Sequence, residues 1–338
     1  MIKQRPILLE LPRQNFQWLH PLRKDDRLAA RPGDGVEVLR AAGYRDEEIR
    51  ALAAAGVLLA CAITESANVG SAQRRHDLLT SLRQMPEAML DVLSRRDVIG
   101  DAARRFAPPK RYWAIVGSGP NTVAAEEVRI KLSELCYKSI ACDVTEDKKH
   151  IDLSSEPLIL VCAAGLVGST VDDVAKEVAI FKAHKAAPIV IATDGEQRFG
   201  AALEVLGVPD VHPRLAFVLS TMVGHLFGYE AALAIDASAR PLREARGTIE
   251  RYVGSSSVGT GWFERFGRDL APHADRFFAG LRSGSYNGHL EASSAVRLAA
   301  LLRFARGHIP LDAYQVEFGK VGTPGGVVED LAGALTRA

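Results

Sequence analysis

Apolar residues in the middle of this chain recur with the two spacings that distinguish strands from helices. Short runs that are almost continuously apolar predict strands at 112–116, 139–144, 157–163, 188–193 and 210–212. The segments between them carry apolar residues every three to four positions, which predicts helices at 121–137, 170–184 and 214–235. Strands that are apolar on both faces and alternate with helices are typical of a mainly parallel sheet covered on both sides. The pattern therefore predicts an α/β domain over residues 111–250.

Helical spacing dominates on both sides of this domain. Residues 1–70 predict an irregular segment with a small helical hairpin at 35–59, and residues 71–110 predict connector helices, with Pro86 allowing a break or kink. A Gly/Ser-rich stretch at 254–261 could be a linker or a phosphate-binding loop. The absence of a preceding strand and of a following Lys-Ser/Thr favours the linker. Helical patterns at 262–282, 289–306 and 325–337 complete a predicted C-terminal extension over residues 251–338.

The turn after the first predicted strand is the candidate binding loop. Thr122 or Asn121 can cap the helix that follows, and the unpaired amides of a helix's first turn attract anions and hydroxyl groups. Ligands of parallel sheets bind beyond the carboxyl ends of the strands, where this loop lies. We expect a bound anion or sugar hydroxyl to be held by Gly117, Ser118, Gly119, Asn121 and Thr122.

The same loop gives no indication of a cofactor. The third glycine of a dinucleotide-binding G-x-G-x-x-G would fall at Thr122, so neither nicotinamide nor flavin is expected. No metal is expected either, because the four cysteines lack the spacing of a zinc site and His289 with Glu291 offers only two ligands. We expect all four cysteines to be buried, reduced thiols in a cytoplasmic protein.

The composition narrows the range of partners. The 42 basic and 41 acidic residues give a net charge of +1, which provides no field to attract nucleic acid or an anionic membrane. The longest apolar run is too short to span a membrane. We therefore expect neither partner, and an anionic substrate would have to be held by local groups.

One face of the first long helix carries candidate chemistry. Glu127, Lys131 and Glu134 are spaced at i, i+4 and i+7, so they lie on the same face. A carboxylate beside an ammonium suits proton transfer on a sugar. The alternative is an ordinary row of surface ion pairs, each of which contributes only about 0.2–0.5 kcal/mol. Spacing alone leaves both interpretations open.

The residues around this helix resemble a known family. The sequence from near Gln73 to Glu250 is similar to the second sugar-isomerase (SIS) half of the glutamine:fructose-6-phosphate aminotransferases. The similarity is densest in EVRIKLSELCY (127–137) and EDKKHIDL (146–153), which resemble the family's A-L-K-L-K-E-I-S-Y and L-K-H-G-P-L. The resemblance implies an SIS-type, flavodoxin-like three-layer sandwich. It also implies that Glu134 moves a proton between sugar carbons 1 and 2, that Lys131 is its electrostatic partner, and that His150 assists ring opening, in that family from the neighbouring subunit.

The sequence also departs from the family. The Gly-Pro after the histidine is replaced by Ile151-Asp152, and Arg246 takes the place of a lysine near the end of the similar region. Arginine can hold an anion but cannot form a Schiff base with a ketose. The family's N-terminal Met-Cys-Gly and the Ser-Gln-Ser-Gly-x-Thr phosphate cradle of the first SIS half are not seen. In the loop at 165–170, Ser169 or Thr170 can cap a helix or bind an anion weakly.

These observations lead to three hypotheses. The first is a phosphosugar isomerase or aminotransferase-type domain that acts on hexose 6-phosphate with a second SIS half, in a homo-oligomer or with a partner SIS or amidotransferase chain. The second is a non-catalytic module that binds a sugar phosphate or serves assembly, which the loss of the lysine and of Gly-Pro favours. The third is a dimerisation scaffold without a ligand, suggested by the apolar helix at 214–235. The retained spacing of Glu134 and His150 favours chemistry, and whether the chain is an enzyme stays open at this point.

Overall fold

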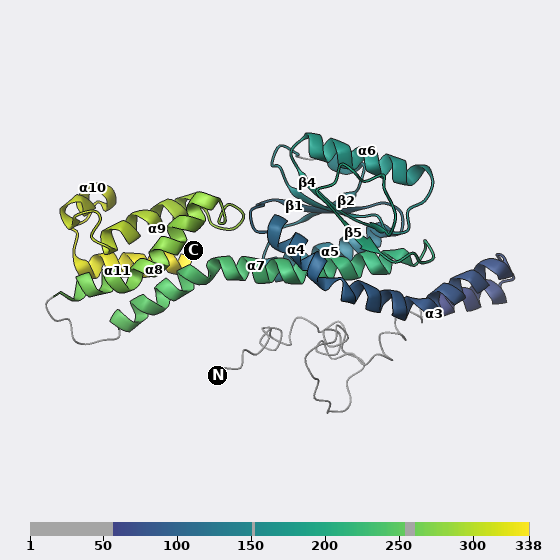
Figure 1. Cartoon of the computed structure of the whole chain (residues 1–338), viewed down its shortest axis with the longest axis horizontal. Helices are drawn as coiled ribbons and strands as arrows, with labels where there is room; N and C mark the ends of the chain where they lie inside the picture. The colour runs from purple at the N-terminus through teal and green to yellow at the C-terminus, as the bar shows by residue number, and fades with distance from the viewer. Residues whose placement is uncertain (1–56, 151–152, 254–260, 338) are drawn as a thin grey trace, which may run out of the picture. The chain divides into compact units, whose positions relative to one another are not determined.

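The computed structural model describes residues 57–150, 153–253 and 261–337 (Figure 1). The chain forms two compact units, residues 1–94 and 95–338. The described part of the first unit contains a helix at Val57–Ser66 and α3 (Ala72–Ser94), which continues through Pro86. This part of the segment predicted to form connector helices, residues 71–110, is therefore helical. Most of the hairpin predicted at 35–59, the Gly/Ser stretch and Ile151-Asp152 lie outside the described residues.

A five-stranded parallel sheet forms the centre of the second unit. Its strands lie in the order β2-β1-β3-β4-β5, and every neighbouring pair is parallel. This is the flavodoxin-like order. After β1, the chain adds β2 on one side, and it then adds β3, β4 and β5 on the other side, so the strand order reverses between β1 and β3. The α/β prediction is confirmed. The strands are β1 (Trp113–Gly117), β2 (Ala141–Val144), β3 (Leu158–Cys162), β4 (Ala187–Thr193) and β5 (Glu204–Val208).

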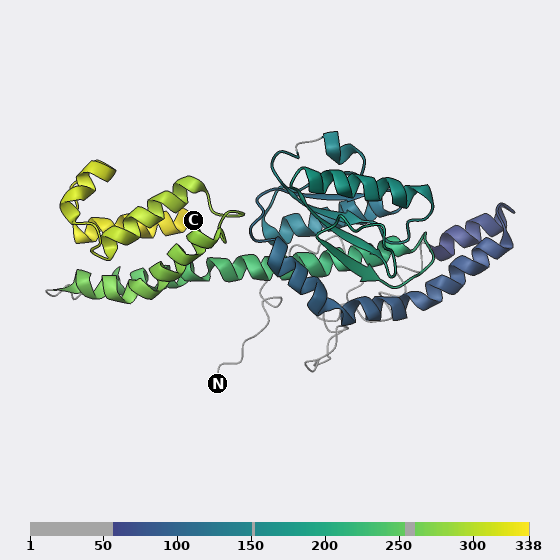
Figure 2. The ribbon, with the colours of Figure 1, turned by 45° about the horizontal axis from the view of Figure 1, so that its top comes forward.

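Helices cover both faces of this sheet. On one face α6 (Ser169–Ala183) packs through Val174 and Phe181 against alternate residues of β1 and β3, such as Val116 and Ile159. The opposite face is covered by α5 (Asn121–Cys136) and α7 (Ala216–Val253) (Figures 1 and 2). This alternation follows from the two-residue period of a strand, and β1 and β3 are buried on both faces.

α5 and α7 approach each other closely because α7 presents glycines to α5. A Cβ on Gly224 would lie 2.3 Å from Val128 Cγ2, and a Cβ on Gly228 would lie 2.4 Å from Leu132 Cδ1. Cys136 Sγ also donates to the Gly228 carbonyl oxygen at 3.7 Å. The two helices therefore run side by side from the carboxyl edge of the sheet towards its amino edge.

The α4 helix (Arg96–Phe106) is held on α7 by a buried carboxylate. Glu230 of α7 is only 6% exposed, and it pairs with Arg96 at 2.8 Å and Arg104 at 2.9 Å. These two guanidinium partners compensate the charge of the buried carboxylate.

Two element predictions are wrong. The strand expected at 210–212 is instead β5 at Glu204–Val208, because Pro209 and Pro213 cannot donate to a ladder on either side of the expected segment. The helix expected to end at residue 235 continues to Val253 through Pro241. Arg243 spans the proline by donating to both carboxylate oxygens of Asp236 at 2.6 and 2.9 Å and to its carbonyl oxygen at 3.1 Å.

α7 is also long and apolar enough to cross a membrane by length and composition, and half of its most apolar window is buried within the structure. Such burial is what the core helix of a globular domain shows. Its length and composition alone therefore do not identify α7 as a membrane-spanning helix.

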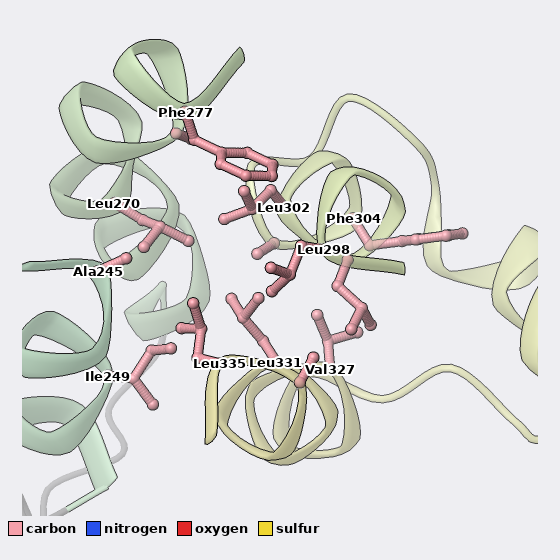
Figure 3. Packing of buried hydrophobic residues seen from close by; sticks show 14 of the residues in the cluster. Ala245, Ile249, Leu270, Phe277, Leu298, Leu302, Phe304, Val327, Leu331 and Leu335 are labelled. Carbon is pink, nitrogen blue, oxygen red and sulfur yellow. The ribbon is translucent and has the colours of Figure 1, made fainter. Parts of the chain in front are cut away.

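The end of α7 enters a second core formed by the C-terminal helices. Ala245 and Ile249 of α7 pack with Leu270, Leu298 and Leu331 (Figure 3). This packing explains why α7 extends beyond the α/β domain. The elements are α8 (Trp262–Ser283), α9 (Ala292–Ala305), the 3₁₀ turn η4 (Leu311–Ala313), α10 (Tyr314–Phe318) and α11 (Pro324–Arg337), close to the predicted helices.

Lys138 joins the α8–α9 loop to the start of the α/β domain, and an ion pair between Arg111 and Glu291 links the same two segments. Lys138 Nζ donates to the carbonyl oxygens of Gly288 at 2.7 Å, Arg111 at 3.1 Å and Lys110 at 3.2 Å. Next to it, burial and then the charge of Lys138 lower the pKa of His289 to about 4. Desolvation lowers the pKa of Lys138 to about 8.

The α5–α7 packing predicts that Gly224→Ala destabilises the protein by about 1–3 kcal/mol, because the new methyl group overlaps Val128. Gly247→Ala is the matched control on the same helix, since a Cβ there meets no atom within 4 Å. The control is expected to be neutral or to stabilise by up to about 1 kcal/mol. Denaturant unfolding measures both changes, and equal effects would contradict the packing described.

The junction predicts a pH dependence. Between about pH 6.5 and 4 the unfolded chain protonates His289 and the folded chain does not, so the free energy of unfolding falls as the pH is lowered through this window. The expected loss is on the order of 1–2 kcal/mol, because partial exposure of the ring reduces the effect. His289→Gln should flatten this part of the profile, whereas His308→Gln, at an exposed histidine, should not. If the free energy of unfolding varied with pH in the same way in the wild type and His289→Gln, this role of His289 would be disproved.

Candidate functional site

Polar groups that follow three of the strands lie at the carboxyl edge of the sheet. Ser118, after β1, donates its hydroxyl to Thr145 Oγ1, after β2, at 3.1 Å. Asn121, the first residue of α5, donates Nδ2 to the carbonyl oxygen of Ala164, after β3, at 2.8 Å. Its Oδ1 accepts a hydrogen bond from Ser220 of α7 at 2.7 Å. Asn121 and Ser220 are buried, so this network ties the loops of β1 and β3 to α7.

This network changes the role expected for Asn121. Ligands of this sheet order bind where the chain reverses between β1 and β3. Here the side-chain amide of Asn121 lies at that point, and both its oxygen and its nitrogen already form hydrogen bonds within the protein. The expectation that Asn121 or Thr122 caps α5 is wrong: the N-cap residue is Pro120, and no side chain caps the helix. Thr122 instead donates its hydroxyl to the Gly117 carbonyl oxygen at 3.3 Å.

The amides at the start of α5 are also engaged. The backbone N–H groups of Asn121, Thr122 and Val123 donate to carbonyl oxygens three residues earlier at 3.3, 3.0 and 3.2 Å. Gly117 permits this tight turn, because a Cβ there would lie 2.2 Å from the Asn121 carbonyl oxygen. Ser118 and Thr122 are partly exposed and Gly119 is exposed, whereas Gly117 and Asn121 are buried, so a ligand can reach only the first three.

A second group of ionisable side chains lies along α5, and we call it the α5 row: Glu127, Lys131 and Glu134. Lys131 Nζ donates to Glu134 Oε2 at 3.2 Å, and the Lys131 side chain is 15% exposed against 43% for Glu134. Glu127 Oε1 lies 3.5 Å from His225 Nε2 of α7. The contact with His225, and to a smaller extent the charges of His225 and Lys131, lower the pKa of Glu127. The row is thus a carboxylate–ammonium–carboxylate line with an imidazole at one end.

His225 is the member of this group that sequence reasoning missed. It lies about a hundred positions after Glu127 in an apolar helix, and no local motif marks it. Only the side-by-side packing of α5 and α7 brings the imidazole to the row.

The loop and the row do not come together within one chain. Asn121 and Glu134 are 13 residues apart on α5, which corresponds to about 20 Å along the helix axis. Because α5 runs from the carboxyl edge of the sheet to its amino edge, the row ends far from the loop. His150 is exposed at the end of η3 (Asp147–His150), which follows β2 at the carboxyl edge. His150 and Glu134 therefore lie at opposite edges of the same sheet.

Arg246 belongs to a third location. It lies on α7, 18 residues or about 27 Å beyond Gly228, which packs against α5 near Glu134. Its guanidinium donates Nε to Glu250 Oε1 at 2.9 Å, and the neighbouring Ala245 and Ile249 pack in the core of the extension. Arg246 is thus separate from both the loop and the row.

Other groups add little chemistry. No cluster of three or more His, Cys, Asp or Glu side chains suited to a metal ion occurs in the part of the chain that the structure describes. The four cysteines are free thiols, but the expectation that all four are buried is wrong for Cys142, which is half-buried on β2. Burial raises the pKa of Cys136 to about 12. α6 begins after Gly168 without a side-chain cap, so the capping expected of Ser169 or Thr170 is wrong.

Known proteins resemble the chain over about half of its length. The glutamine–fructose-6-phosphate aminotransferase (isomerizing) of Thermus thermophilus is 27% identical over 188 residues, which are 55% of this chain and 31% of that enzyme. The enzyme of the same name from Methanosarcina mazei is 29% identical over 163 residues, 47% of this chain and 26% of that enzyme. The chain is related to these aminotransferases over about half its length. The resemblance to this family of aminotransferases is thereby confirmed.

The relationship has limits. The chain spans less than a third of the length of these curated relatives, and no protein-family model matches it. Among solved structures, the C-terminal domain of glucosamine-fructose-6-phosphate aminotransferase from Francisella tularensis is similar, with a TM-score of 0.48 and 18% identity over 52% of this chain and 50% of that chain.

The buried amide network predicts that Asn121→Ala lowers the free energy of unfolding by about 2–3 kcal/mol, because the Ala164 carbonyl and the Ser220 hydroxyl lose their partner away from water. Thr122→Ala is the control, since it removes only a long, partly exposed hydrogen bond. It should cost less than about 1 kcal/mol. Chemical denaturation of both variants measures the difference, and an equally small effect for Asn121→Ala would contradict the bridging role.

Proposed function

We propose that this chain carries out phosphosugar isomerase-type proton transfer on a hexose 6-phosphate. The observation that carries the proposal is the α5 row, in which a Lys131 ammonium lies 3.2 Å from the Glu134 carboxylate. The relationship to isomerizing aminotransferases of fructose 6-phosphate supports the substrate class. The Glu134 side chain is partly exposed, so a ligand can approach it.

The chemistry of each residue follows from its type. Glu134 accepts the proton from a sugar carbon next to the carbonyl and returns it to the neighbouring carbon, which interconverts aldose and ketose. The enediolate that forms in between is negatively charged, and the Lys131 ammonium stabilises it. His150 exchanges a hydroxyl proton during ring opening, for which imidazole is suited near neutral pH.

The proposed site is completed by a second copy of the chain. One chain carries the row near the amino edge of its sheet and His150 with the Ser118 loop at the carboxyl edge, so a single copy cannot present both to one small sugar. A second copy supplies the missing group without any further protein. A partner SIS or amidotransferase chain is the alternative source, and Arg246 would then hold an anion only where such a contact brings it to the row.

A non-catalytic role is the second candidate. The residue at the position of the family's lysine is Arg246, which cannot form a Schiff base and is already paired with Glu250. This observation favours a module that binds a sugar phosphate without converting it.

The test is loss of deuterium from carbon 2 of labelled glucose 6-phosphate in the presence of the full chain. Glu134→Gln should slow the exchange by about 10²–10⁴-fold, the usual contribution of a positioned acid or base. Glu126→Gln, an exposed carboxylate on the same helix outside the row, should exchange at the wild-type rate. Equal rates for Glu134→Gln and the wild type would rule out Glu134 as the base. Binding of the sugar phosphate without any exchange would favour the non-catalytic module.

A further inference from the structure

The loop that carries His150 is fixed to α6 by an ion pair that lies outside the α5 row and the Ser118 loop. Lys149 Nζ lies 2.6 Å from Glu177 Oε1. The Glu177 side chain is 11% exposed and that of Lys149 is 26% exposed, so the contact is largely shielded from water. Lys149 also lies 3.7 Å from Glu146 Oε1 within its own turn.

The burial of this pair distinguishes it from the surface ion pairs nearby. Lys176 and Asp173 on the same helix, α6, form a pair at 3.2 Å in which both side chains are about 70% exposed. Exposed pairs of that kind contribute little, whereas a buried carboxylate needs a partner for its charge. The second oxygen of Glu177 has no hydrogen-bond partner among the described residues, so the contact with Lys149 is what compensates this carboxylate there.

The rest of the turn is anchored as well, but His150 is not buried. Thr145 is 1% exposed and accepts the Ser118 hydroxyl, and Lys148 is 4% exposed. Lys149 follows with its ion pair, and His150 comes next with an exposed side chain. An exposed imidazole that directly follows the anchored Lys149 is held at a defined place while remaining reachable, which is what a proton-exchanging group requires.

We propose that Glu177, acting through Lys149, is a positioning residue that holds His150 where a second copy of the chain can use it. The role of His150 in this inference rests on the proposed function. The ion pair and its effect on the turn do not, so the two can be tested separately.

The first readout is amide hydrogen exchange at residues 146–150 in the full chain, resolved by residue. Lys149→Met and Glu177→Gln should each accelerate exchange there by about tenfold or more, because the turn opens without its anchor. Lys176→Met is the matched control and should leave this exchange unchanged. The charge-reversed pair, Lys149→Glu with Glu177→Lys, should restore slow exchange. Unchanged exchange in both single variants, or failure of the reversed pair to recover it, would overturn the inference.

The second readout connects the ion pair to function. At saturating substrate, the rate of deuterium loss from labelled glucose 6-phosphate should fall in Lys149→Met and recover in the reversed pair. A contact that only stabilises the fold would leave the rate per folded molecule unchanged. If the wild type exchanges no deuterium while the amide results hold, the proposed function fails and the anchoring stands. If deuterium exchange proceeds at the wild-type rate in a variant whose turn has opened, the positioning role is overturned and the proposed function stands.

Discussion

The close approach of α7 to α5 is the constraint on which the rest of the second unit depends. Gly224 and Gly228 allow it, because side chains at these positions would overlap Val128 and Leu132. The same contact brings Ser220 to Asn121 at the carboxyl edge and His225 to Glu127 along the helix. A single packing arrangement therefore supplies the α7 partner of both the loop network and the α5 row.

This arrangement also separates the groups that a sugar site needs. A helix packed antiparallel to its strands has one end at each edge of the sheet, so residues at its start and its end cannot serve the same small ligand. The Ser118 loop and His150 lie at one edge, and Glu134 lies towards the other. The separation is the physical reason why the proposed site is shared between copies. It also bears on the proposed role of His150, because a group offered to a second copy of the chain would have to be held in place by its own chain.

Much of the fold could be predicted from the sequence, because buried parallel strands are continuously apolar and the helices between them have a clear period. Long-range effects could not. Pro241 would end most helices, but Arg243 and Asp236 bridge it, and Ala245 and Ile249 gain a second core beyond it. β5 was missed because Gly207 interrupts a short run whose strand character comes from pairing with β4.

The candidate site was predictable to a similar degree. The spacing of Glu127, Lys131 and Glu134 placed them on one face, as the structure has them, and the resemblance singled out His150. The sequence could not reveal that the Asn121 side chain is hydrogen-bonded to Ala164 and Ser220, since Asn121 and Ser220 are 99 positions apart. Nor could it reveal His225 beside the row, or Glu177 beneath the His150 turn. Each of these contacts joins elements that are separate in the sequence and meet only in the folded chain.

The most direct measurement of the central claim is thermal unfolding of the full chain with and without fructose 6-phosphate, glucose 6-phosphate and glucosamine 6-phosphate. A ligand present at a hundred times its dissociation constant stabilises the folded state by about 2.7 kcal/mol, a rise of a few degrees. The account predicts such a rise with at least one of the three sugars and its loss in Lys131→Met. No rise with any of them, or a rise that survives in Lys131→Met, would contradict a sugar-phosphate site built on the α5 row.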